Sequence, residues 1–188
     1  MKEANEINTP VWIKWIHLGL AVFGILAYLT GELAEHSNSF GYLLHAYLGL
    51  TLLFVLLCRF FYGFWGQRGY RFSNWFPYKK SYLATLKEDI NDLIRLKFPK
   101  RQDHRGFAGL VQAFGLVIFA WMAVTGTIMF VTNVTDDSIL SELHEVGEGL
   151  IPLFLGLHLG AVALHMLSGH NLVSRMIPFR HNEKESTT

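Results

Sequence analysis

The sequence predicts an all-α membrane protein, a four-transmembrane-helix bundle with both termini cytoplasmic and a cytoplasmic amphipathic helix between spans two and three. Of the 188 residues, 51% are hydrophobic and 16% are charged, whereas soluble domains carry about 25% charged residues. The apolar residues are gathered into blocks of about 20, the length at which a helix crosses a hydrocarbon layer. We expect residues 1–188 to form one integral-membrane domain. This composition excludes a disordered chain, a disulfide scaffold and a large soluble enzyme.

Four spans are predicted, over residues 11–30, 40–62, 107–131 and 145–168. The first is too long and too rich in bulky aromatic residues for a cleaved signal peptide. The third contains no charged residue, which argues against a soluble protein with buried helices. The fourth is expected to extend back to about Ile139 as a few polar turns.

The basic residues predict the topology. The connections between spans one and two and between spans three and four contain acidic residues but no Lys or Arg. All 16 basic residues lie near the N-terminus, in or beside the connection 63–106, or after the fourth span. The positive-inside rule makes this side cytoplasmic. We therefore predict a multi-pass protein of the bacterial inner membrane with both termini in the cytoplasm.

The connection 63–106 contains apolar residues at helical spacing, namely Tyr82, Leu83, Leu86, Ile90, Leu93, Ile94 and Phe98. Ser81 is the predicted N-cap of this helix, and Pro99 its predicted end. The pattern predicts an amphipathic helix that lies on the inner membrane face. A solvated connector is the alternative interpretation.

The single cysteine and the small net charge limit the possible cofactors and partners. Cys58 alone cannot form an internal disulfide, a CxxC zinc site, an iron–sulfur cluster or a CxxCH haem attachment. Any metal cofactor must therefore be held by histidines. The net charge of +1 predicts no nucleic-acid partner, and membrane lipid is the expected surrounding.

Five of the nine histidines lie in or at the edge of a predicted span: His17, His45, His144, His158 and His165. An ionisable side chain in a bilayer is costly and is normally kept for function. The predicted topology places the first of these near the cytoplasmic face and the second near the periplasmic face. Along the fourth span, the three histidines lie at successively deeper levels from the outside inward.

The spacing of the fourth-span histidines points to two metal centres. The 14 residues from His144 to His158 give a rise of about 21 Å and bring both onto nearly the same helix face. Two stacked bis-histidine haems need this arrangement, with His45 and His144 outside and His17 and His158 inside. Depth alone leaves His165 as another partner for His17. Interhelical hydrogen bonding, the plain alternative, explains one buried histidine better than four that pair by depth.

The sequence resembles the bacterial cytochrome b561 family and the related cytochrome b subunits of hydrogenases and formate dehydrogenases. The segments that carry the resemblance are WIHLGLAVFGILAYLTGE, HAYLGLTLLFVLLCRFFYGFWG and LHEVGEGLIPLFLGLHLGAVALHMLSGHNLVSRMIP. The segment HRGFAGLVQAFGLVIFAWMAVTGTIMF looks like the third helix of the family, which brings no haem ligand. The resemblance covers nearly the whole chain.

The resemblance implies two non-covalent b-type haems, with axial ligands His17, His45, His144 and His158. It favours His158 over His165 and leaves His165 a supporting contact. It further implies electron transfer across the membrane between a periplasmic-side redox partner and the quinone pool. Bis-histidine iron has no open coordination position, so we predict no catalytic residue.

Four basic residues are expected at the inner interface, where they would pair with haem propionates or shape a quinone site: Lys14, Arg59, Arg105 and Arg175. Snorkelling to phospholipid headgroups is the alternative for each.

Other functions remain open at this point. The chain is alternatively a haem-bearing membrane anchor of a dehydrogenase or hydrogenase complex, or a stand-alone superoxide:quinone oxidoreductase. The connection 63–106 is longer than in compact stand-alone members, which weakens the latter. A histidine-based proton or metal transporter is disfavoured because the spans contain no buried Asp or Glu. Whether the protein is an enzyme, such as a quinone-linked oxidoreductase, is left open.

Overall fold

The computed structural model describes residues 9–34, 39–75, 80–94, 106–134 and 138–167, with positions 173 and 176–178. Four long helices dominate it: α1 (Val11–Leu29), α2 (Phe40–Trp65), α5 (Phe107–Thr132) and α6 (Ile139–Leu167). The short elements are η1 (Glu32–Ala34), η2 (Arg68–Tyr70), α3 (Phe72–Trp75) and α4 (Lys80–Ile94). The described residues contain no strand, which confirms the all-α prediction.

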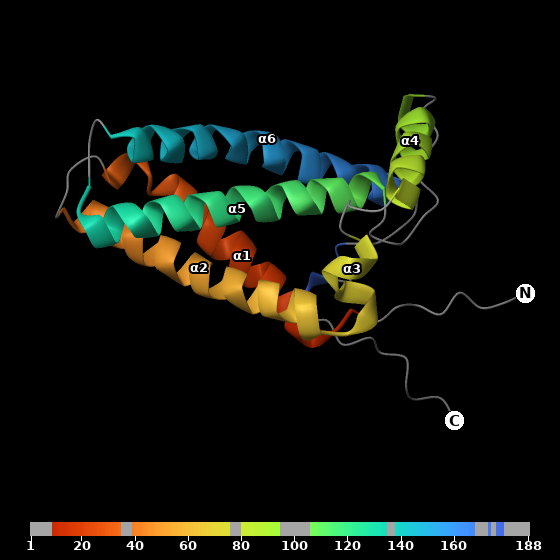
Figure 1. The fold of residues 1–188 in the computed structure, drawn as a ribbon, viewed down its shortest axis with the longest axis horizontal. Coiled ribbons are helices and arrows are strands. Elements are labelled where there is room, and N and C mark those ends of the chain that lie inside the picture. The colour runs from red at the N-terminus through yellow and green to blue at the C-terminus, as the bar shows by residue number, and fades with distance from the viewer. Residues whose placement is uncertain are drawn as a thin grey trace, which may run out of the picture.

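The four long helices form an elongated bundle (Figure 1). In this bundle α1 packs on α2, α2 on α5, and α5 on α6. Each of the four is long and apolar enough to cross a membrane. Their ends agree with the predicted spans to within a few residues, and α6 begins at Ile139 as its polar first turns predicted. The protein is therefore a four-helix membrane bundle.

The core of the bundle is centred on α5, which supplies more buried residues than any other helix. Its small residues let the neighbouring helices approach closely, as is usual in membranes, where packing rather than the hydrophobic effect joins helices. At Gly115, an added Cβ would lie 2.3 Å from the ring of Phe154 on α6. This contact sets the register between α5 and α6.

The predicted connecting helix is present as α4, and it caps the start of α5. The Tyr82 hydroxyl donates to the Gly106 carbonyl at 2.5 Å, and the Asp89 carboxylate accepts the Phe107 N–H at 3.0 Å. Gly106 has φ +75°, and a Cβ there would collide with Asp89, so only glycine fits this junction. These contacts hold α4 across the end of the bundle (Figure 1).

The predicted ends of this connecting helix need one correction. Ser81 was expected to precede the helix as its N-cap, but α4 already begins at Lys80, so Ser81 lies inside the first turn. The predicted end at Pro99 lies outside the described residues.

Candidate metal centres

The bundle brings two pairs of histidines together, one near each end. His45 of α2 and His144 of α6 have ring centroids 6.2 Å apart, and we call this the outer pair. His17 of α1 and His158 of α6 have ring centroids 6.1 Å apart, and we call this the inner pair. The names follow the orientation predicted from the charges. All four rings are half-buried.

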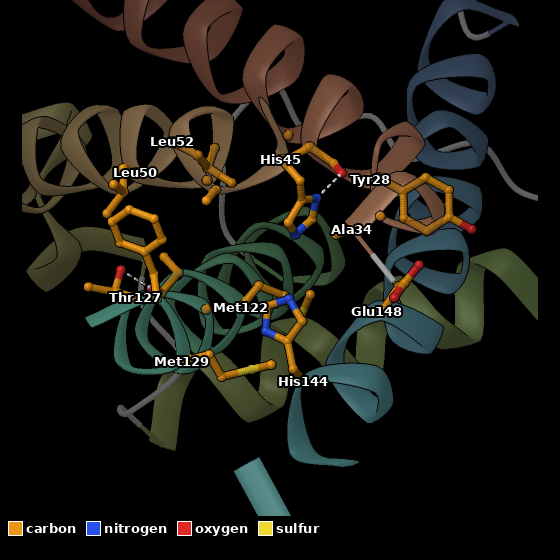
Figure 2. A pocket seen from close by; sticks show the side chains of 18 of the residues that line it. Tyr28, Ala34, His45, Leu50, Leu52, Met122, Thr127, Met129, His144 and Glu148 are labelled. Carbon is orange, nitrogen blue, oxygen red and sulfur yellow. Dashed lines mark hydrogen bonds between the residues drawn. The ribbon is translucent and has the colours of Figure 1, made fainter. Parts of the chain in front are cut away.

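The outer pair lies in a cavity of about 330 Å³ that is lined by residues from all four long helices. Figure 2 shows both imidazoles pointing into this cavity from opposite walls. The lining is mainly apolar, with the carboxylates of Glu145 and Glu148 among the few charged groups. A Cβ added at Gly49, one turn along α2 from His45, would meet no described atom within 4 Å. The wall is therefore recessed beside the histidine, which suits a bulky planar group.

Hydrogen bonds fix the tautomers of the outer pair. The Nδ1 atom of His45 donates to the Ala27 carbonyl at 2.9 Å. The Nδ1 atom of His144 lies 2.8 Å from the Thr125 hydroxyl oxygen, and that hydroxyl donates to the Trp121 carbonyl at 2.8 Å. Thr125 thus accepts the histidine proton. With both Nδ1 atoms protonated, each Nε2 is left free to bind a metal.

The inner pair has a different environment. The ring of Phe154 stacks on His158, with the centroids 5.6 Å apart. Neither His17 nor His158 makes a hydrogen bond to any other described residue. The ring of Phe119, which lines the outer cavity, lies 5.6 Å from Phe154. These two aromatic rings therefore span part of the distance between the two pairs.

The geometry of both pairs fits a haem iron. Two imidazoles that bind one metal from opposite sides, through bonds of about 2 Å, have ring centroids about 6 Å apart. No cluster of three or more His, Cys, Asp or Glu side chains that could hold a metal occurs among the described residues. A structural zinc site needs four donor atoms from the protein. In haem, the porphyrin supplies four nitrogen donors to the iron, so the protein needs to supply only two. Paired histidines thus suit haem better than a bare ion.

His165 does not join the inner pair. Its Nδ1 atom donates to the Ala161 carbonyl of its own helix at 2.8 Å. The ring that faces His17 is that of His158, one heptad away. Of the two partners that depth along the helix leaves open, the bundle therefore brings His158 to His17.

Of the two predicted basic residues that the structure describes, Lys14 and Arg59, only Arg59 is buried. It is 5% exposed, and its guanidinium carbon lies 5.0 Å from the ring centroid of Phe72 and 5.5 Å from that of Trp75. Its Nη1 atom is buried and has no hydrogen-bond partner among the described residues. Burial of this degree is incompatible with snorkelling to a headgroup. Lys14 is half-buried.

Two predicted residues cannot be compared with the structure, and three partners of the site residues were not predicted. Arg105 and Arg175 lie outside the described residues. The sequence analysis did not single out Thr125, because Thr127 in the same apolar span also carries a hydroxyl and only the packing of α5 against α6 brings Thr125 to His144. It also missed the aromatic partners of Arg59, because these follow the end of α2 rather than lying on it.

Fold and site together define a class: a multi-pass membrane protein whose helices bring histidine side chains together in facing pairs. The family model described as prokaryotic cytochrome b561 matches residues 8–179. The chain belongs to the prokaryotic cytochrome b561 family. It is therefore a membrane b-type cytochrome of electron transfer. Comparison with curated proteins and with solved structures gives no match.

Proposed function

We propose that the protein carries two b-type haems and moves single electrons across the bacterial inner membrane, between a redox partner on the periplasmic side and the quinone pool. The observation that supports this most is the presence of two facing histidine pairs, with centroid separations of 6.2 Å and 6.1 Å. One histidine of each pair, His144 or His158, comes from α6, and these two residues lie about 21 Å apart along the helix axis. In this proposal, one centre therefore lies near each face.

In this proposal, His45 and His144 are the axial ligands at the outer centre, and His17 and His158 those at the inner centre. When bound, each haem supplies an iron that takes up and releases one electron with no open position for other ligands. The protein's histidines would hold the iron, and at the outer pair hydrogen bonds fix the ring tautomers while the surrounding side chains exclude water. The apolar lining of the outer cavity serves the last purpose.

Arg59 is proposed to bind a carboxylate of the inner haem or a carbonyl of the quinone. It lies 14 residues after His45 on α2, so it is on nearly the same helix face, about 21 Å closer to the inner end. Its buried Nη1 atom has no hydrogen-bond partner in the part of the chain that the structure describes, and leaving a buried charged donor unpaired is costly. An acceptor brought by a ligand would satisfy it.

Three further basic residues are proposed to pair with haem propionates or to shape the quinone site at the inner end: Lys14, Arg105 and Arg175. His165 is proposed to make a supporting contact at the same end. Lys14 precedes His17 by three residues and so lies about one helical turn away on α1. His165 lies one heptad beyond His158 on α6. Both termini are proposed to be cytoplasmic on the basis of the charge distribution.

Haem stoichiometry tests the proposed function. Protein purified from a haem-replete bacterial membrane and reduced with dithionite should show the α-band of low-spin haem b. The pyridine haemochrome assay should give two haems per chain. Material without haem would refute the assignment, and a single haem would refute the two-centre arrangement.

A further inference from the structure

The two histidine pairs differ in the hydrogen bonds that their imidazole rings make. At the outer pair, both Nδ1 atoms have acceptors, the Ala27 carbonyl for His45 and the Thr125 hydroxyl for His144. At the inner pair, neither imidazole has a hydrogen-bond acceptor among the described residues. The protein thus treats two chemically identical ligand pairs differently.

We propose that Thr125 is a positioning residue that lowers the reduction potential of the outer centre, so that the outer centre has a lower potential than the inner one. The proposal rests on the two-haem function above. An imidazole whose Nδ1–H donates a hydrogen bond is a more basic ligand through Nε2. A more basic ligand stabilises the ferric over the ferrous state, which lowers the potential.

Charged residues also favour a lower reduction potential at the outer centre than at the inner one. Glu145 and Glu148 line the outer cavity, and negative charge near an iron favours its more positive ferric state. At the other end, the buried cation Arg59 favours the ferrous state. Glu148 is half-buried and Arg59 is buried, so water and salt screen these two charges less than they screen the exposed Glu145. Hydrogen bonding and local charge therefore both place the lower potential outside.

This order of potentials gives electron transfer a direction. With both haems bound, this order would favour the transfer of one electron from the outer to the inner centre, so that the outer iron would be oxidised as the inner iron is reduced. Each transfer oxidises a one-electron donor at the periplasmic face. Two transfers, with the uptake of two protons, reduce one quinone to quinol.

The test is a redox titration of the full-length, haem-loaded protein, followed at the α-band. The His144→Ala variant, which lacks the outer ligand, identifies the potential of the inner centre. The other potential measured in the unaltered protein then belongs to the outer centre, and it should be the lower of the two. An outer potential equal to or above the inner one would overturn the proposal, whatever the effect of any Thr125 variant.

Substitution of Thr125 tests the residue itself. Thr125→Val, which keeps the shape but removes the acceptor, should raise the outer potential and leave the inner one unchanged. We expect a three- to tenfold change in the ferrous-to-ferric ratio at a fixed ambient potential, where tenfold corresponds to about 59 mV for one electron. Thr125→Ser should restore the original value, because it keeps the hydroxyl.

A matched control is available on α2. The Thr51 hydroxyl donates to the Tyr47 carbonyl four residues earlier, as the Thr125 hydroxyl does to Trp121, but Thr51 makes no hydrogen bond to a described histidine. Thr51→Val should leave both potentials unchanged. If Thr125→Val retained two haems with unshifted potentials, this inference would fail while the proposed function stood. Absence of haem from the unaltered protein would instead refute the function.

Discussion

His17 and His158 face each other with ring centroids 6.1 Å apart, although the first lies near the start of α1 and the second in α6. Their partners in the outer pair, His45 and His144, lie on α2 and again on α6. The last helix thus contributes to both pairs, while α1 and α2 contribute one ring each. This division predicts that each centre can be removed separately.

Replacing His144 by alanine should remove the outer haem and leave the inner one. The haem content should fall from two to one per chain, because only one of the two imidazole pairs is broken. The pyridine haemochrome assay on purified protein measures this. The matched control is His165→Ala on the same helix, which should keep two haems because its ring bonds its own backbone. Loss of both haems in His144→Ala, or of one in His165→Ala, would contradict the ligand assignment.

Replacing Arg59 by glutamine should lower the potential of the inner centre. The cation stabilises the reduced state there, and its removal should also cost about 1 kcal/mol of stability through the lost contacts with Phe72 and Trp75. Redox titration and thermal unfolding measure the two effects. Lys87→Gln is the control, since Lys87 is exposed on α4 and its charge is screened by salt. An inner potential that does not respond to Arg59→Gln would show that this cation faces no haem.

Replacing Tyr82 by phenylalanine should loosen the junction of α4 with α5. The lost hydrogen bond to the Gly106 carbonyl should lower the free energy of unfolding by about 1 kcal/mol near neutral pH. Thermal unfolding in detergent, followed by circular dichroism, checks this value. An unchanged melting temperature would mean that the bond contributes nothing to stability.

The same bond should make the stability depend on alkaline pH. Burial, with the nearby Asp89 carboxylate, raises the pKa of Tyr82 from 10.0 to about 12. The folded state therefore favours the neutral phenol, so this stabilisation is complete below pH 10 and is lost as the pH rises towards 12. The stability difference between the unaltered protein and Tyr82→Phe should narrow over that range. The six other tyrosines are common to both proteins and cancel in the comparison.

A reporter enzyme fused after residue 188 should behave as cytoplasmic. The expected result follows from the basic residues, all of which lie on one side of the four spans. Paired fusions of alkaline phosphatase and green fluorescent protein, which are active on opposite sides of the membrane, measure it. Phosphatase activity at this position would overturn the orientation and exchange the outer and inner centres.

The sequence alone was sufficient to predict the four helices and the levels of the histidines along them. Hydropathy reports burial in lipid residue by residue, and a helix rises a constant 1.5 Å per residue. The start of α6 at Ile139 and the 14-residue step from His144 to His158 are local properties of this kind. They required no knowledge of neighbouring helices.

The tertiary structure decided which groups meet across helices. That His158 rather than His165 faces His17 depends on where α6 lies along the bundle relative to α1. Close packing of Phe154 against Gly115 fixes the position of α6 along α5. The acceptor for His144 comes from α5, and the aromatic partners of Arg59 come from α3. Such contacts join residues distant in the chain, and hydropathy and helical periodicity describe only one helix at a time.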